Sequence, residues 1–221
     1  LMFDLLPEEE RAGAAKRLVS DIETRGDHIS TGFTATSYIL HVLSQYGYSD
    51  VAYKLLLQKE FPSWLYPITK GATTIWERWD GIKPDGSFQT PGMNSFNHYA
   101  YGAVGDWMYP NILGFSGTNG FSDLTFKLPE DCPFEWAEGS YFSLYGLIES
   151  KWKKADKNFI WDISIPANSC GSLTLSTEQW THVKEFNRDL SECHIEESSL
   201  GVLIRMGSGE YTISVPMIDN N

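Results

Sequence analysis

The first half of the chain alternates apolar and polar residues with the period of an α-helix. Pro7 and the three glutamates after it form a typical helix start, because proline fits the first turn and acids favour the positive end of the helix dipole. Apolar residues then recur at helical spacing as far as Gly26. Three further helices are predicted in the same way: residues 36–46, a segment from Ser49 or Asp50 to Leu56, and residues 97–108. Short helices joined by short loops predict antiparallel helix pairs.

The second half changes to the two-residue period of β-strands. The predicted strands are residues 141–147, 159–165, 173–175, 202–205 and 211–215. Gly207, Ser208 and Gly209 predict a hairpin turn between the last two strands. Several short strands with turn signals predict a small β-sandwich. The change of period divides the chain into domains 1–113 and 119–221.

A long segment of different amino-acid composition lies between the third and fourth predicted helices, at residues 62–94. It is dense in Gly, Pro, Trp and Asp. A loop of this length inside a compact domain is usually functional or disordered. Its aromatic content argues against disorder. We therefore look for a functional site here first.

Composition limits the classes of partner. The formal net charge of -12 argues against nucleic acid and against an anionic membrane surface, and a neutral substrate stays compatible. No apolar run reaches the ~20 residues of a membrane span. Aromatic residues make up 14% of the chain, and their flat rings suit the faces of sugars. The alternative is an aromatic core.

The three cysteines show no metal-binding spacing. Cys132, Cys170 and Cys193 are far apart and form no CxxC pair, whereas a zinc site needs about four clustered ligands. We expect buried free thiols, the alternative being one disulfide with an odd thiol left over. Asp80, Asp85 and Asp106 do not converge as metal ligands either, and Asp85 with the following glycine predicts a turn. No metal and no cofactor are expected.

The densest chemical segment surrounds Glu77. This carboxylate lies between Trp76 and Trp79, with Arg78 beside it and Asp80 three residues on. A general base must be ionised and must reach a water molecule. The alternative is a structural ion pair of Glu77 with Arg78 near a helix end. Asp80 is expected to orient Arg78 or to position the loop.

His98 is the second candidate. Asn94, Ser95 and Asn97 are expected to cap the helix that it enters, which places His98 in the first turn. The positive helix end favours a neutral imidazole, which can hydrogen-bond a sugar hydroxyl. The alternative is a histidine satisfied within the core.

These segments carry a resemblance to a known family. The run GATTIWERWDG and the later run NSFNHYAYGA resemble bacterial-type α-L-rhamnosidases, which form glycoside hydrolase family 78. ISTGFTATSYIL upstream is similar to the late catalytic helices of that family, and GSYFSLYGLIESKW and LIRMGSGEYTISV downstream to its C-terminal β-sandwich. The likeness covers nearly the whole chain. It implies an α+β multidomain fold, with the last helices of an (α/α)6 barrel followed by a small antiparallel β-sandwich.

The resemblance also implies roles for single residues. The glutamate of the WERW segment is the general base of the family, which here is Glu77. The histidine of the NHYAYGA segment contacts rhamnose, which here is His98. Arg78, Trp76 and Trp79 are expected beside the substrate, the alternative for the two indoles being packing of the barrel. The family's general acid belongs to an earlier motif that no part of this sequence matches.

The function implied is the inverting hydrolysis of terminal α-L-rhamnose from oligosaccharides, polysaccharides or glycosides. The partner for this piece is the upstream part of the same polypeptide, without which residues 1–221 are expected to be inactive. One rival is a non-catalytic carbohydrate-binding or scaffolding piece. Another is a different (α/α)6 glycosidase or a lyase, although a lyase should show clustered cations near its histidine, and the run GATTIWERWDG offers only Arg78. The compartment stays open, a periplasmic or secreted setting being preferred to a cytoplasmic one.

Overall fold

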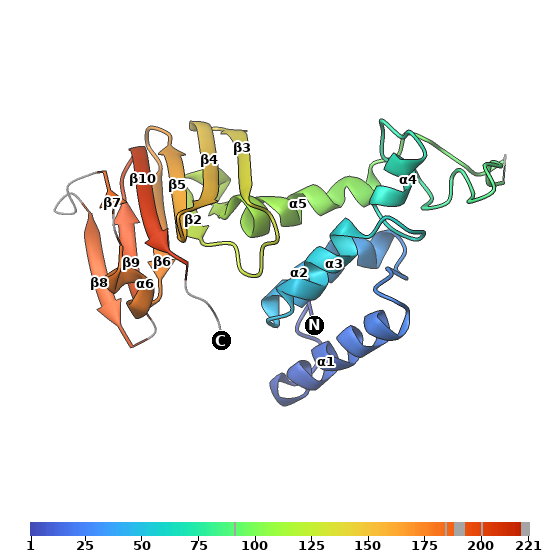
Figure 1. The fold of residues 1–221 in the computed structure, drawn as a ribbon, viewed down its shortest axis with the longest axis horizontal. Coiled ribbons are helices and arrows are strands. Elements are labelled where there is room, and N and C mark those ends of the chain that lie inside the picture. The colour runs from blue at the N-terminus through green and yellow to red at the C-terminus, as the bar shows by residue number, and fades with distance from the viewer. Residues whose placement is uncertain (91, 184, 188–192, 200, 218–221) are drawn as a thin grey trace. The chain divides into compact units, whose positions relative to one another are not determined.

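The computed structural model describes residues 1–221 except 91, 184, 188–192, 200 and 218–221. The chain divides into two compact units, Leu1–Trp107 and Met108–Asn221 (Figure 1). The first unit is helical and the second is built from β-strands. The boundary between residues 113 and 119 stays a prediction.

The helical unit follows the predicted pattern over its first three helices. Its elements are α1 (Glu8–Thr24), α2 (Phe33–Gln45), α3 (Ser49–Leu57), α4 (Leu65–Thr69), the 3₁₀ turn η1 (Ala100–Ala103) and α5 (Val104–Met108). α1 begins directly after Pro7 and carries three glutamates in its first turn. Gly26 follows its end with a φ of 70°, a conformation that glycine adopts readily.

The predicted helix over residues 97–108 is wrong at its start. Its first helical turn is η1, which begins at Ala100. The reason is that the preceding amides have other partners: His98 N–H donates to Ile75 O at 2.8 Å, and Asn97 N–H to Ser95 Oγ at 3.2 Å. His98 therefore precedes the helix rather than lying in its first turn, and Asn94, Ser95 and Asn97 do not cap η1 as expected.

Packing of α2, α3 and α5 forms the core of the helical unit. α2 and α3 lie side by side as an antiparallel pair (Figure 1). Trp107 of α5 is 1% exposed, packs edge to face on Tyr53 of α3, and donates from Nε1 to Ser44 Oγ of α2 at 3.0 Å. Asp106 contacts His41 of α2 at 3.1 Å, which joins the end of the unit to that helix.

The second unit contains two five-stranded sheets. The first has the order β1 (Phe115–Thr118), β2 (Asp123–Lys127), β6 (Cys170–Leu175), β9 (Gly201–Met206) and β8 (His194–Ser198). The second has the order β3 (Trp136–Ser143), β4 (Gly146–Ala155), β5 (Asn158–Ile165), β10 (Gly209–Pro216) and β7 (Glu185–Phe186). Three short helical elements accompany the strands in the part of the unit that the structure describes: η2 (Tyr109–Leu113), η3 (Asn119–Phe121) and α6 (Thr177–Thr181).

The two sheets pack face to face, as a β-sandwich does. Phe126 of β2 and Trp161 of β5 are each 0% exposed and meet edge to face, with their centroids 5.9 Å apart. The sandwich is not purely antiparallel, because β2 and β6 pair in parallel. Between β2 and β6 the chain crosses to the other sheet and forms β3, β4 and β5 there. It then crosses back, and β6 runs beside β2 in the same direction.

Two strand predictions are also corrected. The residues around Gly207 do not form a hairpin, because β9 and β10 belong to different sheets and this turn carries the chain from one to the other. The predicted strand 141–147 is interrupted, since β3 ends at Ser143 and β4 begins at Gly146 with a φ of 131°. Alternation along the sequence identifies strands but does not tell which strands pair.

The start of the second unit is tied to its core by buried polar contacts. Trp152 Nε1 donates to Ile112 O at 2.6 Å. Ser150 Oγ donates to Leu113 O and accepts from Trp161 Nε1. These bonds satisfy the carbonyls at the end of η2, which the helix itself leaves without partners. The end of η2 is therefore fixed against β4 and β5.

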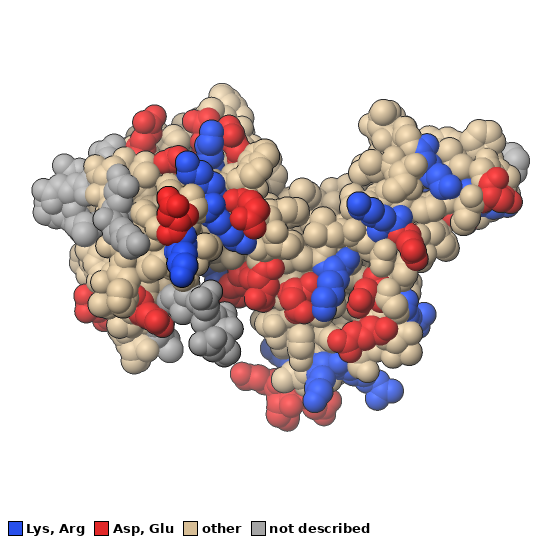
Figure 2. Space-filling model, in the orientation of Figure 1, with Lys and Arg blue, Asp and Glu red and all other residues tan. Residues whose placement is uncertain are grey.

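The expectation of buried free thiols is met only in part. Cys132 and Cys170 are free thiols, but Cys132 is buried and Cys170 is exposed, and Cys193 is half-buried. Among the described residues, no helix has the length and apolarity needed to cross a membrane. On the face drawn in Figure 2, basic and acidic side chains are interspersed.

Gly114, which follows η2, allows a test of the second unit. Its φ is 77°, and a Cβ there would lie 2.6 Å from Lys127 O and 2.8 Å from the Trp161 ring. We expect Gly114→Ala to lower the free energy of unfolding by ~3 kcal/mol or more, from backbone strain together with overpacking. Urea unfolding measures this loss.

Gly120→Ala is the matched control. Gly120 has a similar φ of 71°, but its nearest neighbour would be the flexible end of Leu144 at 3.3 Å. We expect a loss of about 1 kcal/mol from backbone strain alone. Equal losses for the two variants would show that the close packing at Gly114 contributes nothing.

Candidate active site

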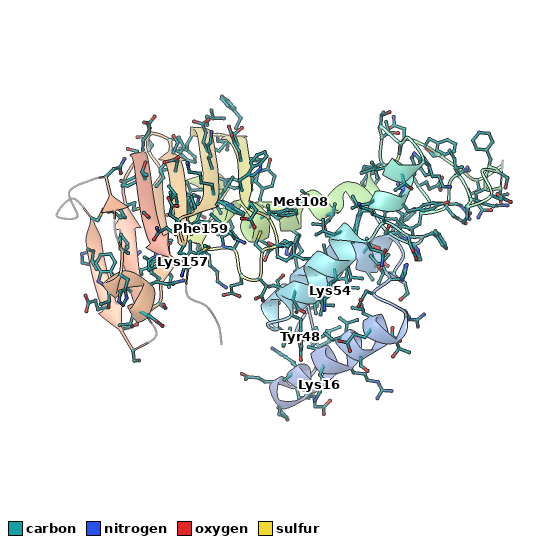
Figure 3. All side chains as sticks on the ribbon, viewed as in Figure 1. Lys16, Tyr48, Lys54, Met108, Lys157 and Phe159 are labelled. Carbon is teal, nitrogen blue, oxygen red and sulfur yellow. The ribbon has the colours of Figure 1, made fainter. Side chains whose placement is uncertain are left out.

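The long loop between α4 and η1 has a regular hydrogen-bonded arrangement. Two of its segments, 74–81 and 94–98, lie side by side, and we call them the paired segments. Their contacts are His98 N–H to Ile75 O at 2.8 Å, Glu77 N–H to Ser95 O at 2.9 Å, and Thr74 Oγ1 to Phe96 O. This loop is drawn next to α4 in Figures 1 and 3, with side chains crowding along it. The backbone of the expected site is therefore fixed by its own contacts.

The tip of the loop is a turn, as predicted. Lys83 N–H donates to Ser87 O at 2.8 Å, and Gly86 has a φ of 85°. Asp85 Oδ1 accepts from both the N–H and the hydroxyl of Ser87, and these bonds lower the pKa of the Asp85 carboxyl. Asp80 accepts from the Gln89 amide, so it positions the loop, one of its two expected roles. Both carboxylates therefore serve the structure of the loop.

The paired segments also hold the side chain of Glu77. Its Oε2 accepts from Ser95 N–H at 2.9 Å, and the residue is half-buried. Glu77 lies in a loop and not at a helix end, and among the described residues it forms no ion pair with Arg78. The structural ion pair is therefore not the arrangement found. The carboxylate is held by a backbone amide, which leaves its other oxygen available.

An aromatic stack stands beside Glu77. Trp79 lies flat on Tyr101, with centroids 3.6 Å apart and an interplanar angle of 11°. Trp64 meets Trp79 edge to face at 5.4 Å and donates from Nε1 to Tyr101 O at 2.9 Å. The stack joins three residues that are distant in sequence. Sequence reasoning missed Trp64 and Tyr101, although Tyr101 lies inside the segment that carries the family resemblance.

The pKa of the Tyr101 phenol depends on its burial and on the charged residues around it. Burial raises its pKa, Arg78 opposes this shift, and Asp80 and Glu77 add to it. All three charged residues of the WERWD segment therefore act on this one ring. The phenol stays protonated at neutral pH and can donate a hydrogen bond.

Trp76 has a different environment from Trp79. It is 5% exposed and meets Phe96 edge to face at 5.0 Å. A Cβ on Gly81 would lie 3.0 Å from both rings, so this position fits a glycine. Trp76 packs the interior of the loop in this structure, and its expected contact with substrate stays a prediction, as does that of Trp79.

His98 lies in a second aromatic group. Its ring stacks on Phe33 of α2 at 4.8 Å and on Tyr99 at 5.2 Å. Nδ1 accepts from Ala100 N–H at 3.3 Å, so the neutral ring carries its proton on Nε2, which can donate to a ligand. Phe33 also meets Tyr101 edge to face at 5.2 Å, which links the two aromatic groups. Sequence reasoning also missed Phe33, although it lies inside the run ISTGFTATSYIL that carries part of the family resemblance.

The fold thus brings together the carboxylate of Glu77, the imidazole of His98 and a flat aromatic surface. Among the described residues, no group of three or more His, Cys, Asp or Glu side chains could hold a metal ion. Enzymes that cleave glycosidic bonds act through carboxyl groups used in pairs, and Glu77 is a candidate for one member of such a pair.

Comparison with known proteins identifies the family. The model of the bacterial α-L-rhamnosidase six-hairpin glycosidase domain matches residues 1–112, and that of the bacterial α-L-rhamnosidase C-terminal domain matches residues 115–188. The chain belongs to the bacterial α-L-rhamnosidase family.

Individual relatives agree with this family. An α-L-rhamnosidase of Streptomyces avermitilis is 41% identical over 97% of the chain, and one of Formosa agariphila is 33% identical over 96%. The chain spans only 21% and 24% of their lengths. It therefore corresponds to a piece of such proteins.

Solved structures give the same result. The crystal structure of the Streptomyces avermitilis α-L-rhamnosidase complexed with L-rhamnose matches with a TM-score of 0.86 at 40% identity, over 96% of this chain and 20% of that one. The α-L-rhamnosidase of Aspergillus terreus matches with a TM-score of 0.79 at 32% identity, over 95% of this chain and 22% of that one.

The aromatic stack makes a prediction about stability. Trp79→Ala removes the face that covers Tyr101 and the edge contact with Trp64, so we expect a loss of about 2–4 kcal/mol in the free energy of unfolding. Trp79→Phe keeps a stacked ring and should lose only ~1 kcal/mol. Urea unfolding compares the two variants, and the stack is not a stabilising element if they lose the same amount.

Proposed function

We propose that this chain is the part of an inverting α-L-rhamnosidase that supplies the general base. The observation that carries the proposal is the carboxylate of Glu77, which one backbone amide holds by a single oxygen beside an aromatic surface. The helical unit is then the last portion of an (α/α)6 barrel, and the second unit is the sandwich that follows it. The similarity to the bacterial rhamnosidase family supports this assignment.

The proposed reaction uses two carboxyl groups on opposite faces of the sugar. The acid protonates the glycosidic oxygen as its bond to C1 breaks, and Glu77 takes a proton from the water that attacks C1 from the other side. The water oxygen forms the new bond, so α-linked L-rhamnose leaves as the β-anomer. The two carboxyls of an inverting enzyme stand ~6.5–9.5 Å apart, which leaves room for the water.

The acid is proposed to come from the upstream part of the same polypeptide. In the loop between α4 and η1, the other carboxylates are those of Asp80 and Asp85. Each accepts a hydrogen bond from a side chain of the same loop. The bonds from Ser87 lower the pKa of the exposed Asp85 carboxyl, whereas a general acid needs a raised pKa. A partner from another part of a barrel is compatible with the reaction, because the two carboxyls act from opposite faces of the sugar.

His98 and the aromatic stack are proposed to bind the sugar. The Nε2–H of His98 can donate to a rhamnose hydroxyl, while Phe33 and Tyr99 hold the ring by stacking. Trp79 is half-buried, and its exposed part is proposed to receive the methyl group and C–H bonds of rhamnose, while the buried Tyr101 supports the indole from the side that it covers. Arg78 lies near enough to act on Tyr101 and is proposed to contact the substrate from the same side.

The substrates proposed are neutral rhamnose-containing oligosaccharides, polysaccharides or glycosides. The net charge of -12 suits a neutral ligand better than an anionic one. The main rival is a non-catalytic carbohydrate-binding piece, in which the same surface holds sugar without cleaving it. The two functions differ in what they require of Glu77.

The variant Glu77→Gln in the full-length protein distinguishes catalysis from non-catalytic sugar binding. The amide has nearly the same shape as the carboxylate but cannot take a proton, so we expect kcat on a rhamnoside to fall by about 10²–10⁴-fold with little change in thermal stability. Steady-state kinetics and thermal unfolding give the two numbers. If the variant keeps more than about a tenth of the wild-type kcat, Glu77 is not the base.

A further inference from the structure

The contact between Glu77 and Ser95 is reciprocal. The backbone N–H of Glu77 donates to Ser95 O at 2.9 Å, and the backbone N–H of Ser95 donates to Glu77 Oε2 at 2.9 Å. Among the described residues, no other group donates to this carboxylate. One carboxylate oxygen therefore has a fixed partner, and the other, Oε1, is left for a ligand or a water molecule.

The N–H that holds Oε2 belongs to the peptide unit between Asn94 and Ser95, and the side chain of Asn94 anchors that unit. Asn94 Nδ2 donates to Gly81 O at 3.1 Å, across the paired segments. Its Oδ1 is buried and has no partner among the described residues. A Cβ on Gly81 would lie 3.3 Å from this oxygen and 3.0 Å from two rings, so the amide is confined.

From these contacts we infer that Asn94 and the Ser95 backbone amide are positioning groups for Glu77. They hold Oε2 so that Oε1 is the atom that receives the proton of the attacking water. This inference rests on the proposed function, in which Glu77 is the base. Neither residue touches the reacting atoms, and both act only through the carboxylate.

The size of the effect follows from what positioning contributes. A displacement of about 1 Å in a catalytic group can cost ~100-fold in rate. A hydrogen bond to an ionised carboxylate is shorter and about twice as strong as a neutral one. Loss of the Ser95 amide should therefore lower kcat, whereas KM depends mainly on the surfaces that bind the sugar.

Ser95→Pro and Ser95→Ala form the direct test in the full-length protein. Proline has no N–H, and alanine keeps the N–H but loses the hydroxyl that contacts Asn97. We expect Ser95→Pro to lower kcat on an aryl rhamnoside by about 10–100-fold with KM within about threefold. Ser95→Ala should stay within about threefold of wild type in both constants. Equal kinetics for the two variants would overturn the inference.

Asn94→Ala is the second variant, needed because proline can disturb the fold. It keeps every backbone donor and removes only the amide that binds Gly81 O. We expect kcat to fall by about 3–30-fold with KM nearly constant. If kcat is unchanged in Asn94→Ala, Asn94 does not position Glu77. This result counts even if Ser95→Pro does not fold.

A third measurement shows whether both residues act through Glu77. In a Glu77→Ala background, azide can replace water: its nitrogen bonds to C1 as the bond to the aryl oxygen breaks, and it has no proton to lose. If Asn94 and Ser95 only position the base, adding Asn94→Ala or Ser95→Pro to Glu77→Ala leaves the azide-supported rate unchanged. A further fall in that rate would show general damage to the site and contradict the inference.

The role of Glu77 as the base and the positioning role of Asn94 and Ser95 are refuted by different results. If Glu77→Gln keeps its activity, the proposed base is wrong. If Glu77→Gln is inactive while Ser95→Pro and Asn94→Ala resemble wild type, the base stands and the positioning role is refuted.

Discussion

The exchange of hydrogen bonds between Glu77 and Ser95 is the contact on which the rest of the site depends. It joins the two paired segments at the point where the carboxylate projects, so the main chain and the side chain are fixed together. A half-buried carboxylate without such a partner would cost free energy and would turn towards water. Because the donor is a backbone amide, the orientation of Glu77 depends on the register of the loop, which the side chain of Asn94 helps to fix through Gly81 O.

The aromatic residues support the same arrangement from outside. Trp79 and Tyr101 connect the first paired segment to η1, while Phe33 connects α2 to both His98 and Tyr101. These contacts join elements that lie far apart in sequence. They tie the loop that carries Glu77 and His98 to η1 and to α2.

The sequence predicts elements and single candidates better than it predicts their relations. The first three helices follow from the apolar period and from Pro7, and the turn at Asp85 follows from its residue types. The apolar period could not show that the backbone N–H of His98 donates to Ile75 O, a bond that makes the fourth helix start later than predicted. Nor could it show that β9 and β10 lie in different sheets. The edge-to-face contact of Trp64 with Trp79 and the amide that holds Glu77 could not be predicted either, since both are tertiary contacts.

A crystal structure of the full-length protein with bound L-rhamnose tests the central claim most directly. We expect Glu77 Oε2 to stay about 2.9 Å from Ser95 N, with Oε1 facing the anomeric carbon and a water molecule, or the anomeric hydroxyl of the β-anomer, between them. A second carboxyl should lie ~6.5–9.5 Å away on the opposite face of the sugar. A carboxylate turned away from Ser95, or an Oε1 that no water can join to the anomeric carbon, would contradict the account.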